Sequence, residues 1–194
     1  MSPSGAADLL VEARGALLDA LEALRDHLQA VIVIGAQAIY LHTGGAAVAL
    51  AEATKDSDLA LDKRVLANEP LLEVALRAAN FIPNPETNQP GAWVTARGIP
   101  VDLMVPESLA GAGPGGRRAA RIPPHAKHVA RRAAGLEAAV VDYTPMQIKA
   151  LDPSDTRVVR AHVAGPAALL IAKLHKVGER TDTEGVKSSE TGCA

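Results

Sequence analysis

Hydrophobic and polar positions repeat with two different periods along the chain, and each period predicts a kind of element. Apolar residues recur every three or four positions over residues 6–30, 69–79 and 166–179, which predicts helices. Short apolar runs, several of them rich in β-branched residues, predict strands. These runs lie at 31–34, 56–61, 93–95, 99–105, 138–143, 148–151 and 157–163. The pattern predicts an α/β (α+β) protein with a single domain over residues 1–180.

The same pattern divides the domain into a core at 31–105, a basic loop at 110–132, and further strands and a helix at 138–180. In the last helix an apolar stripe lies beside a row of cations. The stripe contains Leu170, Leu174 and Val177. The row contains Lys173, Lys176 and Arg180. Apolar residues almost vanish afterwards, so residues 181–194 are expected to form a disordered tail.

Composition narrows the class of protein. The chain has 194 residues, a net charge of −2 and only 2% aromatic residues. Its one cysteine, Cys193, leaves no disulfide framework and no Cys/His zinc spacing. Residues 1–30 lack the pattern of a secretion signal, and no stretch is long and apolar enough to span a bilayer. These features predict a soluble, cytoplasmic protein without a membrane partner.

Acidic residues on the predicted strands supply the first candidate chemistry. Asp56 and Asp58 are two positions apart, so they share one face of a strand while Ser57 points to the other. Two carboxylates on one face repel each other unless a cation lies between them, and carboxylate oxygens suit Mg²⁺. The alternative is a solvated strand end.

A third acid, Asp102, stands among apolar residues of the 99–105 strand. Acids in such surroundings are rare unless they are paired or bound to a metal. We favour the metal interpretation over a salt bridge to Arg97 or a nearby lysine.

Gly35 follows the apolar run 31–34 and opens a short helix over 35–42, which Gly44 is expected to end as a C-cap. A glycine at such a turn lets the backbone approach a ligand, and the free N–H groups of the helix start favour an anion. An ordinary strand-to-helix turn remains the alternative.

Residues 117–132 carry cations and no acid. Charge runs are most often solvated surface, yet this concentration of positive charge in an otherwise acidic chain would attract a phosphate backbone. No aromatic residue lies among the cations, so base stacking is not offered there. The candidate RNA-contacting residues are Arg117, Arg118, Arg121, Lys127, Arg131 and Arg132.

A glycine-led turn, an Asp-x-Asp strand and a later strand with a single acid follow one another in this chain. The segments are Ile34-Gly35-Ala36, Lys55-Asp56-Ser57-Asp58-Leu59 and Val101-Asp102-Leu103. In this order they resemble the nucleotidyltransferase superfamily that includes DNA polymerase β. The Lys173 to Arg180 helix makes the chain similar, more narrowly, to the AbiEii/MenT group of toxins from bacterial toxin–antitoxin systems. The resemblance runs from about Val31 to Arg180 and implies a small mixed β-sheet flanked by helices.

The resemblance implies a metal-dependent transfer of a nucleotide from an NTP to a hydroxyl acceptor. The implied Mg²⁺ ligands and catalytic acids are Asp56, Asp58 and Asp102, with Lys173 as a further catalytic residue. The implied nucleotide-binding residues are Gly35, Ala36, Lys173, Lys176 and Arg180. In the MenT group the acceptor is typically the 3′ end of tRNA, and a cognate antitoxin is the implied protein partner. A phosphate on Thr54 would occupy the metal site and repel the NTP.

Two features depart from this resemblance. Ala36 stands where the superfamily has Gly or Ser, so a hydroxyl contact to phosphate is lost. The Lys-Asp-x-x-Asp motif that follows the helix in the AbiEii/MenT group is missing after Arg180, which predicts a C-terminally truncated copy. Two alternatives therefore stay open, namely a non-catalytic module that binds a nucleotide or a partner, and a small-molecule nucleotidyltransferase. The low aromatic content disfavours the second.

Overall fold

The computed structural model describes residues 3–44, 56–111 and 118–190, and within them the side chains of 8–44, 56–111 and 118–178. Eight strands of the described chain form one mixed sheet. They are β1 (Val31–Ile34), β2 (Ser57–Leu61), β3 (Ile82–Pro83), β4 (Ala92–Val94), β5 (Pro100–Pro106), β6 (Arg131–Ala133), β7 (Tyr143–Lys149) and β8 (Val158–Ala164). The strand order is β3-β4-β5-β2-β1-β8-β7, and β6 also pairs with β5. The predicted class and the mixed sheet are confirmed.

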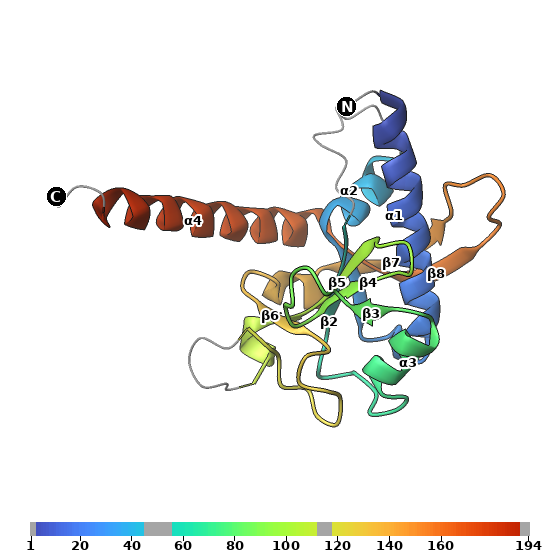
Figure 1. Cartoon of the computed structure of the whole chain (residues 1–194), viewed down its shortest axis with the longest axis horizontal. Coiled ribbons are helices and arrows are strands. Elements are labelled where there is room, and N and C mark those ends of the chain that lie inside the picture. The colour runs from blue at the N-terminus through green and yellow to red at the C-terminus, as the bar shows by residue number, and fades with distance from the viewer. Residues whose placement is uncertain (1–2, 45–55, 112–117, 191–194) are drawn as a thin grey trace.

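Four α-helices and three short 3₁₀ helices complete the described fold (Figure 1). The α-helices are α1 (Pro3–Ala23), α2 (Gly35–Thr43), α3 (Leu72–Ala78) and α4 (Pro166–Glu190). The 3₁₀ helices are η1 (Arg25–His27), η2 (Glu107–Leu109) and η3 (Glu137–Val140). None of the described helices has both the length and the apolar character that a membrane span requires.

Alternation along the central strands separates two hydrophobic layers. One face of the sheet presents Val33, Leu59 and Leu103 to the apolar side of α1, including Leu17 and Leu21. The opposite face packs against η3 and the first turns of α4. Its residues include Ile32, Ala60, Met104, Val140 and Ala168. Because β1 is buried at all four positions, it has helices over both faces, as its continuous apolar run predicts.

Helix α4 starts where β8 ends, and an aspartate outside the helix holds that start. The Asp142 carboxylate accepts a hydrogen bond from the Ala168 amide at 2.9 Å, and the Asp142 carbonyl accepts one from the Gly165 amide at 2.8 Å. A Cβ at position 165 would overlap the Asp142 carboxylate, so a larger residue there would displace the aspartate from the helix start. The rest of α4 projects away from the sheet (Figure 1).

Several helix boundaries differ from the predictions for physical reasons. The predicted helix 6–30 ends at Ala23, because η1 and the turn after it reverse the chain into β1. The predicted helix 69–79 spans only Leu72–Ala78. Its expected first turn is held outside the helix, since the Pro70 carbonyl bonds to His27 and the Leu72 amide to His125.

The chain after residue 136 also departs from its pattern. The first residues of the predicted strand 138–143 belong to η3, which covers the sheet with Ala139 and Val140. The predicted strand 148–151 begins earlier, as β7, and the two-residue strand β3 forms where the pattern predicts no strand.

Helix α4 differs from the prediction in which residues it buries and in where it ends. The predicted stripe is exposed, with Leu170 and Leu174 each 60% accessible. Leu169 and Ala172 pack against the protein instead, so the helix is rotated relative to the predicted orientation. Residues 181–190 are helical where composition predicts a disordered tail, and helix propagation explains this since each added residue brings one further backbone hydrogen bond. Residues 191–194 lie outside the described residues.

Candidate active site

Two acids predicted as metal ligands are paired across neighbouring strands. β2 and β5 run parallel in a register that places Asp58 opposite Asp102, and on the other side of β2 Asp58 lies opposite Ile34 of β1. Adjacent strands are about 4.8 Å apart, so the two carboxylates project side by side. Both stand on the face that carries Ala60 and Met104, two residues further along each strand. The fold thus brings together two of the three acids that the resemblance names as metal ligands.

The carboxylate of Asp58 lies directly against Gly35, the first residue of α2. Gly35 has φ +66°, and a Cβ at this position would overlap Asp58 Oδ2 and lie 3.1 Å from Cγ. The glycine is therefore needed both for its left-handed backbone and for the space it leaves. The close approach that this turn allows in the structure is to Asp58, an acid of the candidate site.

Asp102 forms an ion pair that the sequence did not predict. Nη2 of Arg131 donates to Oδ2 of Asp102 at 2.9 Å, and the side chains are 27% and 25% accessible. Arg97, the partner considered in the sequence, is an exposed residue of the hairpin turn between β4 and β5. Arg131 was grouped with the RNA-contacting cations, but its guanidinium lies in the acid site.

The surroundings of Asp58 disfavour its negative charge. Burial, together with repulsion from Asp102 and more weakly from Asp56, raises the pKa of the Asp58 carboxyl to about 6. Arg131 and Lys176 oppose this rise in the pKa through their positive charges. Positive charge near the pair is thus insufficient to offset burial and repulsion, and the site favours an added cation.

The other two residues of the Asp-x-Asp motif, Ser57 and Asp56, have different surroundings. Ser57 is buried and its hydroxyl donates to the Ala13 carbonyl of α1 at 3.0 Å. Asp56 lies one residue before β2, is exposed, and is near enough to raise the pKa of Asp58. Thr54, the predicted phosphorylation site, lies outside the described residues.

The donor set fits a hard divalent cation with two protein carboxylates. Within the described side chains no three His, Cys, Asp or Glu residues gather into a metal-binding group, so Asp56 is not drawn in beside the pair. Mg²⁺ is commonly bound through one or two carboxylates and takes waters and phosphate oxygens as its other ligands. Asp58 and Asp102 supply two such carboxylates, although Arg131 already pairs with one oxygen of Asp102.

Polar contacts, of which the bond between Arg14 and Gln37 is buried, hold α2 at the end of the sheet. Arg14 of α1 donates through Nε to the Gln37 side chain at 2.8 Å and through Nη1 to the Lys149 carbonyl at 3.1 Å. The Nε2 atom of His42 lies 2.8 Å from the Ala164 carbonyl at the end of β8. Among the described side chains none caps the start of α2, which leaves the first amides, including that of Ala36, for a ligand. These contacts fix the orientation of the glycine-led turn.

The structure describes the side chains of two of the three cations predicted on α4, Lys173 and Lys176. The charge of Lys176 is close enough to Asp58 to lower its pKa, so this part of α4 borders the acid pair. Lys173 is exposed on the preceding turn. Arg180 lies in the part of α4 whose side chains are not described. The first half of α4 is pressed close to the 133–136 turn, where a Cβ on Gly135 would overlap His175.

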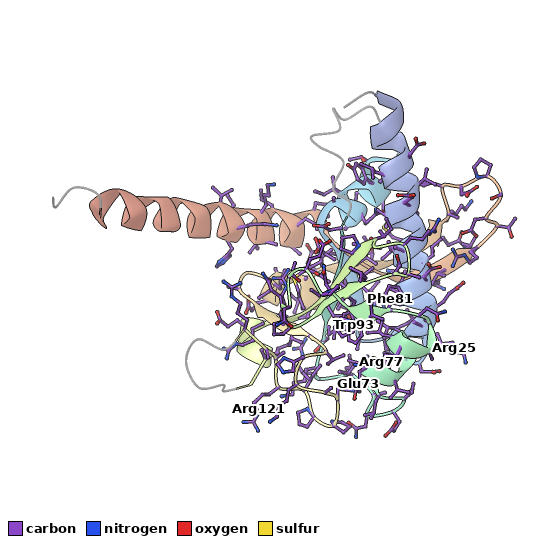
Figure 2. All side chains as sticks on the ribbon, in the orientation of Figure 1. Arg25, Glu73, Arg77, Phe81, Trp93 and Arg121 are labelled. Carbon is purple, nitrogen blue, oxygen red and sulfur yellow. The ribbon has the colours of Figure 1, made fainter. Side chains whose placement is uncertain are left out.

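The remaining basic residues lie elsewhere on the surface. Arg118, Arg121 and Lys127 are exposed, and Figure 2 shows Arg121 at the edge of the molecule, well apart from α4. Arg132 instead donates to the Gly111 carbonyl and pairs with Glu107 at 3.4 Å. Arg117 lies outside the described residues. The basic run is thus divided between the site, an internal contact and the open surface.

A family model described as nucleotidyltransferase matches residues 12–190, and this chain belongs to that family. Membership places it among proteins that transfer a nucleotide from an NTP. No match was found among curated proteins or among solved structures.

The sequence missed residues that act through distant contacts. The ion pair of Arg131 was missed because Arg131 lies within a run of cations, and nothing in its local sequence distinguishes it from Arg132. Asp142 and Gly165, which anchor α4, are 23 positions apart and show no motif. The one usable signal was the Gly165-Pro166 pair, which marks a helix start.

Proposed function

We propose that this chain transfers a nucleotide from an NTP to a hydroxyl group, with the 3′ end of tRNA as acceptor, and that it acts as the toxin of a toxin–antitoxin pair. The observation that supports the transfer is the in-register pair of Asp58 and Asp102 beside the glycine-led start of α2. Family membership supports the NTP as donor.

In this proposal Asp58 and Asp102, with Asp56 at the rim, hold Mg²⁺. The ion would supply charge neutralisation at the phosphates and would favour the ionised acceptor hydroxyl. Asp102 lies nearest the acceptor and orients its hydroxyl oxygen toward the α-phosphorus. That oxygen forms the new bond to phosphorus, the bond from the α-phosphorus to the bridging oxygen breaks, and pyrophosphate leaves. The hydroxyl proton passes to solvent.

Positive groups around the acids would position the triphosphate. The backbone amides at Gly35 and Ala36 face the phosphates at the uncapped start of α2. Lys176, whose charge already reaches Asp58, would offset the charge that grows on pyrophosphate. Lys173 and Arg180 would extend that role along α4.

The proposed acceptor rests on the basic surface and on the resemblance of the motifs to the AbiEii/MenT group. The exposed cations Arg118, Arg121 and Lys127 offer a phosphate-backbone contact away from the acids. A toxin role further requires a cognate antitoxin, and phosphorylation at Thr54 would be one way to silence the transfer.

A transfer assay tests the proposal. Wild-type protein, labelled NTPs, Mg²⁺ and total tRNA should give labelled tRNA, whereas Asp58→Ala should give none. Equal absence of label with both proteins would reject the enzymatic claim. Expression of the wild type but not of Asp58→Ala should slow growth if the protein is a toxin.

The Arg131–Asp102 ion pair favours a second candidate, a module that binds a nucleotide without turnover. A guanidinium on the acid nearest the acceptor would block transfer if it stayed there. Tight binding of a fluorescent NTP with no labelled product from any acceptor would support this module.

A further inference from the structure

Arg131 has more hydrogen-bonding capacity than its ion pair uses. A guanidinium has five N–H donors in a planar fork. Nη2 bonds to Asp102, whereas Nε is buried and has no hydrogen-bond partner among the described residues. An unpartnered N–H beside the acid pair can bind a further acceptor, and phosphate oxygens match the fork well.

The backbone of Arg131 is held rigidly next to the acids. β6 pairs in parallel with β5, which places Arg131 opposite Met104, two residues beyond Asp102. The Arg132 amide donates to the Arg118 carbonyl at 2.7 Å. Gly91 has φ +78°, and a Cβ there would lie 2.6 Å from the Arg131 amide nitrogen. The main chain is therefore fixed, while the partly exposed side chain can change partners.

Charge balance gives a reason for the guanidinium to change partner. With Arg131 in place, Asp102 already has a counter-ion at 2.9 Å. A divalent cation that binds Asp58 and Asp102 competes for the same carboxylate oxygen, since Arg131 Nη2 lies on Oδ2. Once that oxygen is taken, the released guanidinium stays within reach of the ligands of the cation, which include phosphate oxygens in an NTP complex.

We propose that Arg131 is a triphosphate-binding residue of the nucleotide site, which pairs with Asp102 in the nucleotide-free protein and passes to a phosphate oxygen when Asp102 binds a divalent cation. This inference rests on the proposed function for the identity of the ligand, but it concerns binding and does not require turnover. It also assigns Arg131 a role apart from the RNA-contacting cations. The same exchange frees Asp102, so the ion pair would not block nucleotide transfer.

Two binding measurements with opposite expected signs test the proposal. In Arg131→Gln, the affinity for a fluorescent NTP in excess Mg²⁺ should fall by about 10- to 100-fold, which corresponds to the loss of one or two charged hydrogen bonds. In the same variant without nucleotide, Mn²⁺ binding followed by electron paramagnetic resonance should become about threefold to tenfold tighter, because a competing cation has been removed. A purely structural role would weaken both.

Controls separate the role of the fork from charge and folding. Arg131→Lys keeps the charge but loses the planar fork, so its NTP affinity should lie between those of wild type and Arg131→Gln. It also serves as the test variant if Arg131→Gln does not fold. Arg77→Gln removes an exposed arginine on α3 and should change neither affinity.

Three outcomes would overturn the proposal. They are an unchanged NTP affinity in both Arg131 variants, a parallel loss of NTP and Mn²⁺ binding, and a wild type that binds no NTP. A wild type that binds NTP without transferring it would reject the proposed enzymatic function alone, and the Arg131 measurements would still decide this inference.

Discussion

The side chain of Asp58 rests on the α-carbon of Gly35, and no residue with a Cβ can occupy position 35 without displacing that carboxylate. The turn that starts α2 and the second acid of the Asp-x-Asp motif therefore fit closely against each other. The glycine serves the geometry of the acid pair as well as the turn itself.

Gly35→Ala should therefore cost more than backbone strain. Alanine at φ +66° costs about 1–2 kcal/mol, and overlap with Asp58 adds to it, so we expect a loss of about 3 kcal/mol in urea unfolding. The matched control is Gly44→Ala, which has φ +60° but nothing within 4 Å of the new Cβ. It should lose only the backbone strain, about 1–2 kcal/mol. Equal losses would show that the contact with Asp58 is unimportant.

Asp58→Asn should stabilise the protein at pH 8 in the absence of divalent cations. The raised pKa means that the folded state binds a proton more tightly than the unfolded state, so stability falls as pH rises from about 4 to about 6. The full cost, up to about 3 kcal/mol, is present at pH 8 and is removed with the charge. Differential scanning fluorimetry should show a higher Tm.

Asp62→Asn is the control for this experiment, and added Mg²⁺ tests whether a cation binds at Asp58. Asp62→Asn should lower Tm, because hydrogen bonds from Arg64 lower the pKa of Asp62 and the charge is stabilising there. Added Mg²⁺ should raise the Tm of the wild type and leave that of Asp58→Asn unchanged. A Mg²⁺ shift of equal size in both proteins would contradict a cation site at Asp58.

His125 should make the protein less stable on the acid side. Its side chain is 6% exposed, and Nδ1 accepts from the Leu72 amide while Nε2 donates to the Ala67 carbonyl. Burial lowers the pKa of His125, assisted by repulsion from His27 and opposed by the Ala67 bond and by Glu73 and Glu69. Its contribution is present above the unfolded value near 6.5 and is lost as pH falls through the lower folded value.

Urea unfolding at pH 7.5, 6.5 and 5.5 measures this loss, up to about 1 kcal/mol per pH unit. Asp58→Asn is the suitable background, because protonation of Asp58 stabilises the wild type over an overlapping range. In that background His125→Asn should flatten the pH dependence, whereas His128→Asn at an exposed position should not. A slope that survives His125→Asn would assign it to another group.

Asp142→Ala should loosen α4 and weaken nucleotide binding at the same time. The lost hydrogen bond to the Ala168 amide is worth about 1–2 kcal/mol, as for other helix N-terminal caps. Lys176 would lose its fixed position near Asp58, so NTP affinity should drop about tenfold, measured by fluorescence titration. Asp152→Ala, in the β7–β8 turn where the acid bonds to Ser154, should leave NTP affinity unchanged. An unchanged affinity in Asp142→Ala would separate the anchor from the site.

Arg121→Gln should change the salt dependence of tRNA binding without changing NTP affinity. Loss of one phosphate contact should reduce the slope of log K against log salt by about 0.7–0.9. Filter binding at several salt concentrations measures that slope. Arg77→Gln is the matched surface control, and Figure 2 labels both arginines, Arg77 on α3 and Arg121 in the loop that precedes β6. Identical slopes for both variants and the wild type would place the RNA elsewhere.

Local pattern was sufficient where a residue's role depends on its immediate neighbours. The apolar run at 31–34 predicted a buried strand, period two placed Ser57 on the face away from Asp58, and the apolar run at 99–105 predicted the strand that carries Asp102. Boundaries that depend on distant contacts were missed. Helix α3 starts late because His27 and His125, both far away in sequence, take the polar groups of its expected first turn.

The sequence by itself determined the order of strands and helices and which face of a strand each acid can occupy, because both follow from side-chain periods of 2 and 3.6 residues. Only the tertiary structure decided that β2 and β5 are parallel neighbours, that Asp58 therefore meets Asp102, and that Arg131 completes the pair. The physical reason is that strand pairing and ion pairing join residues separated by tens of positions. Which residues meet at that distance depends on how all the layers pack together.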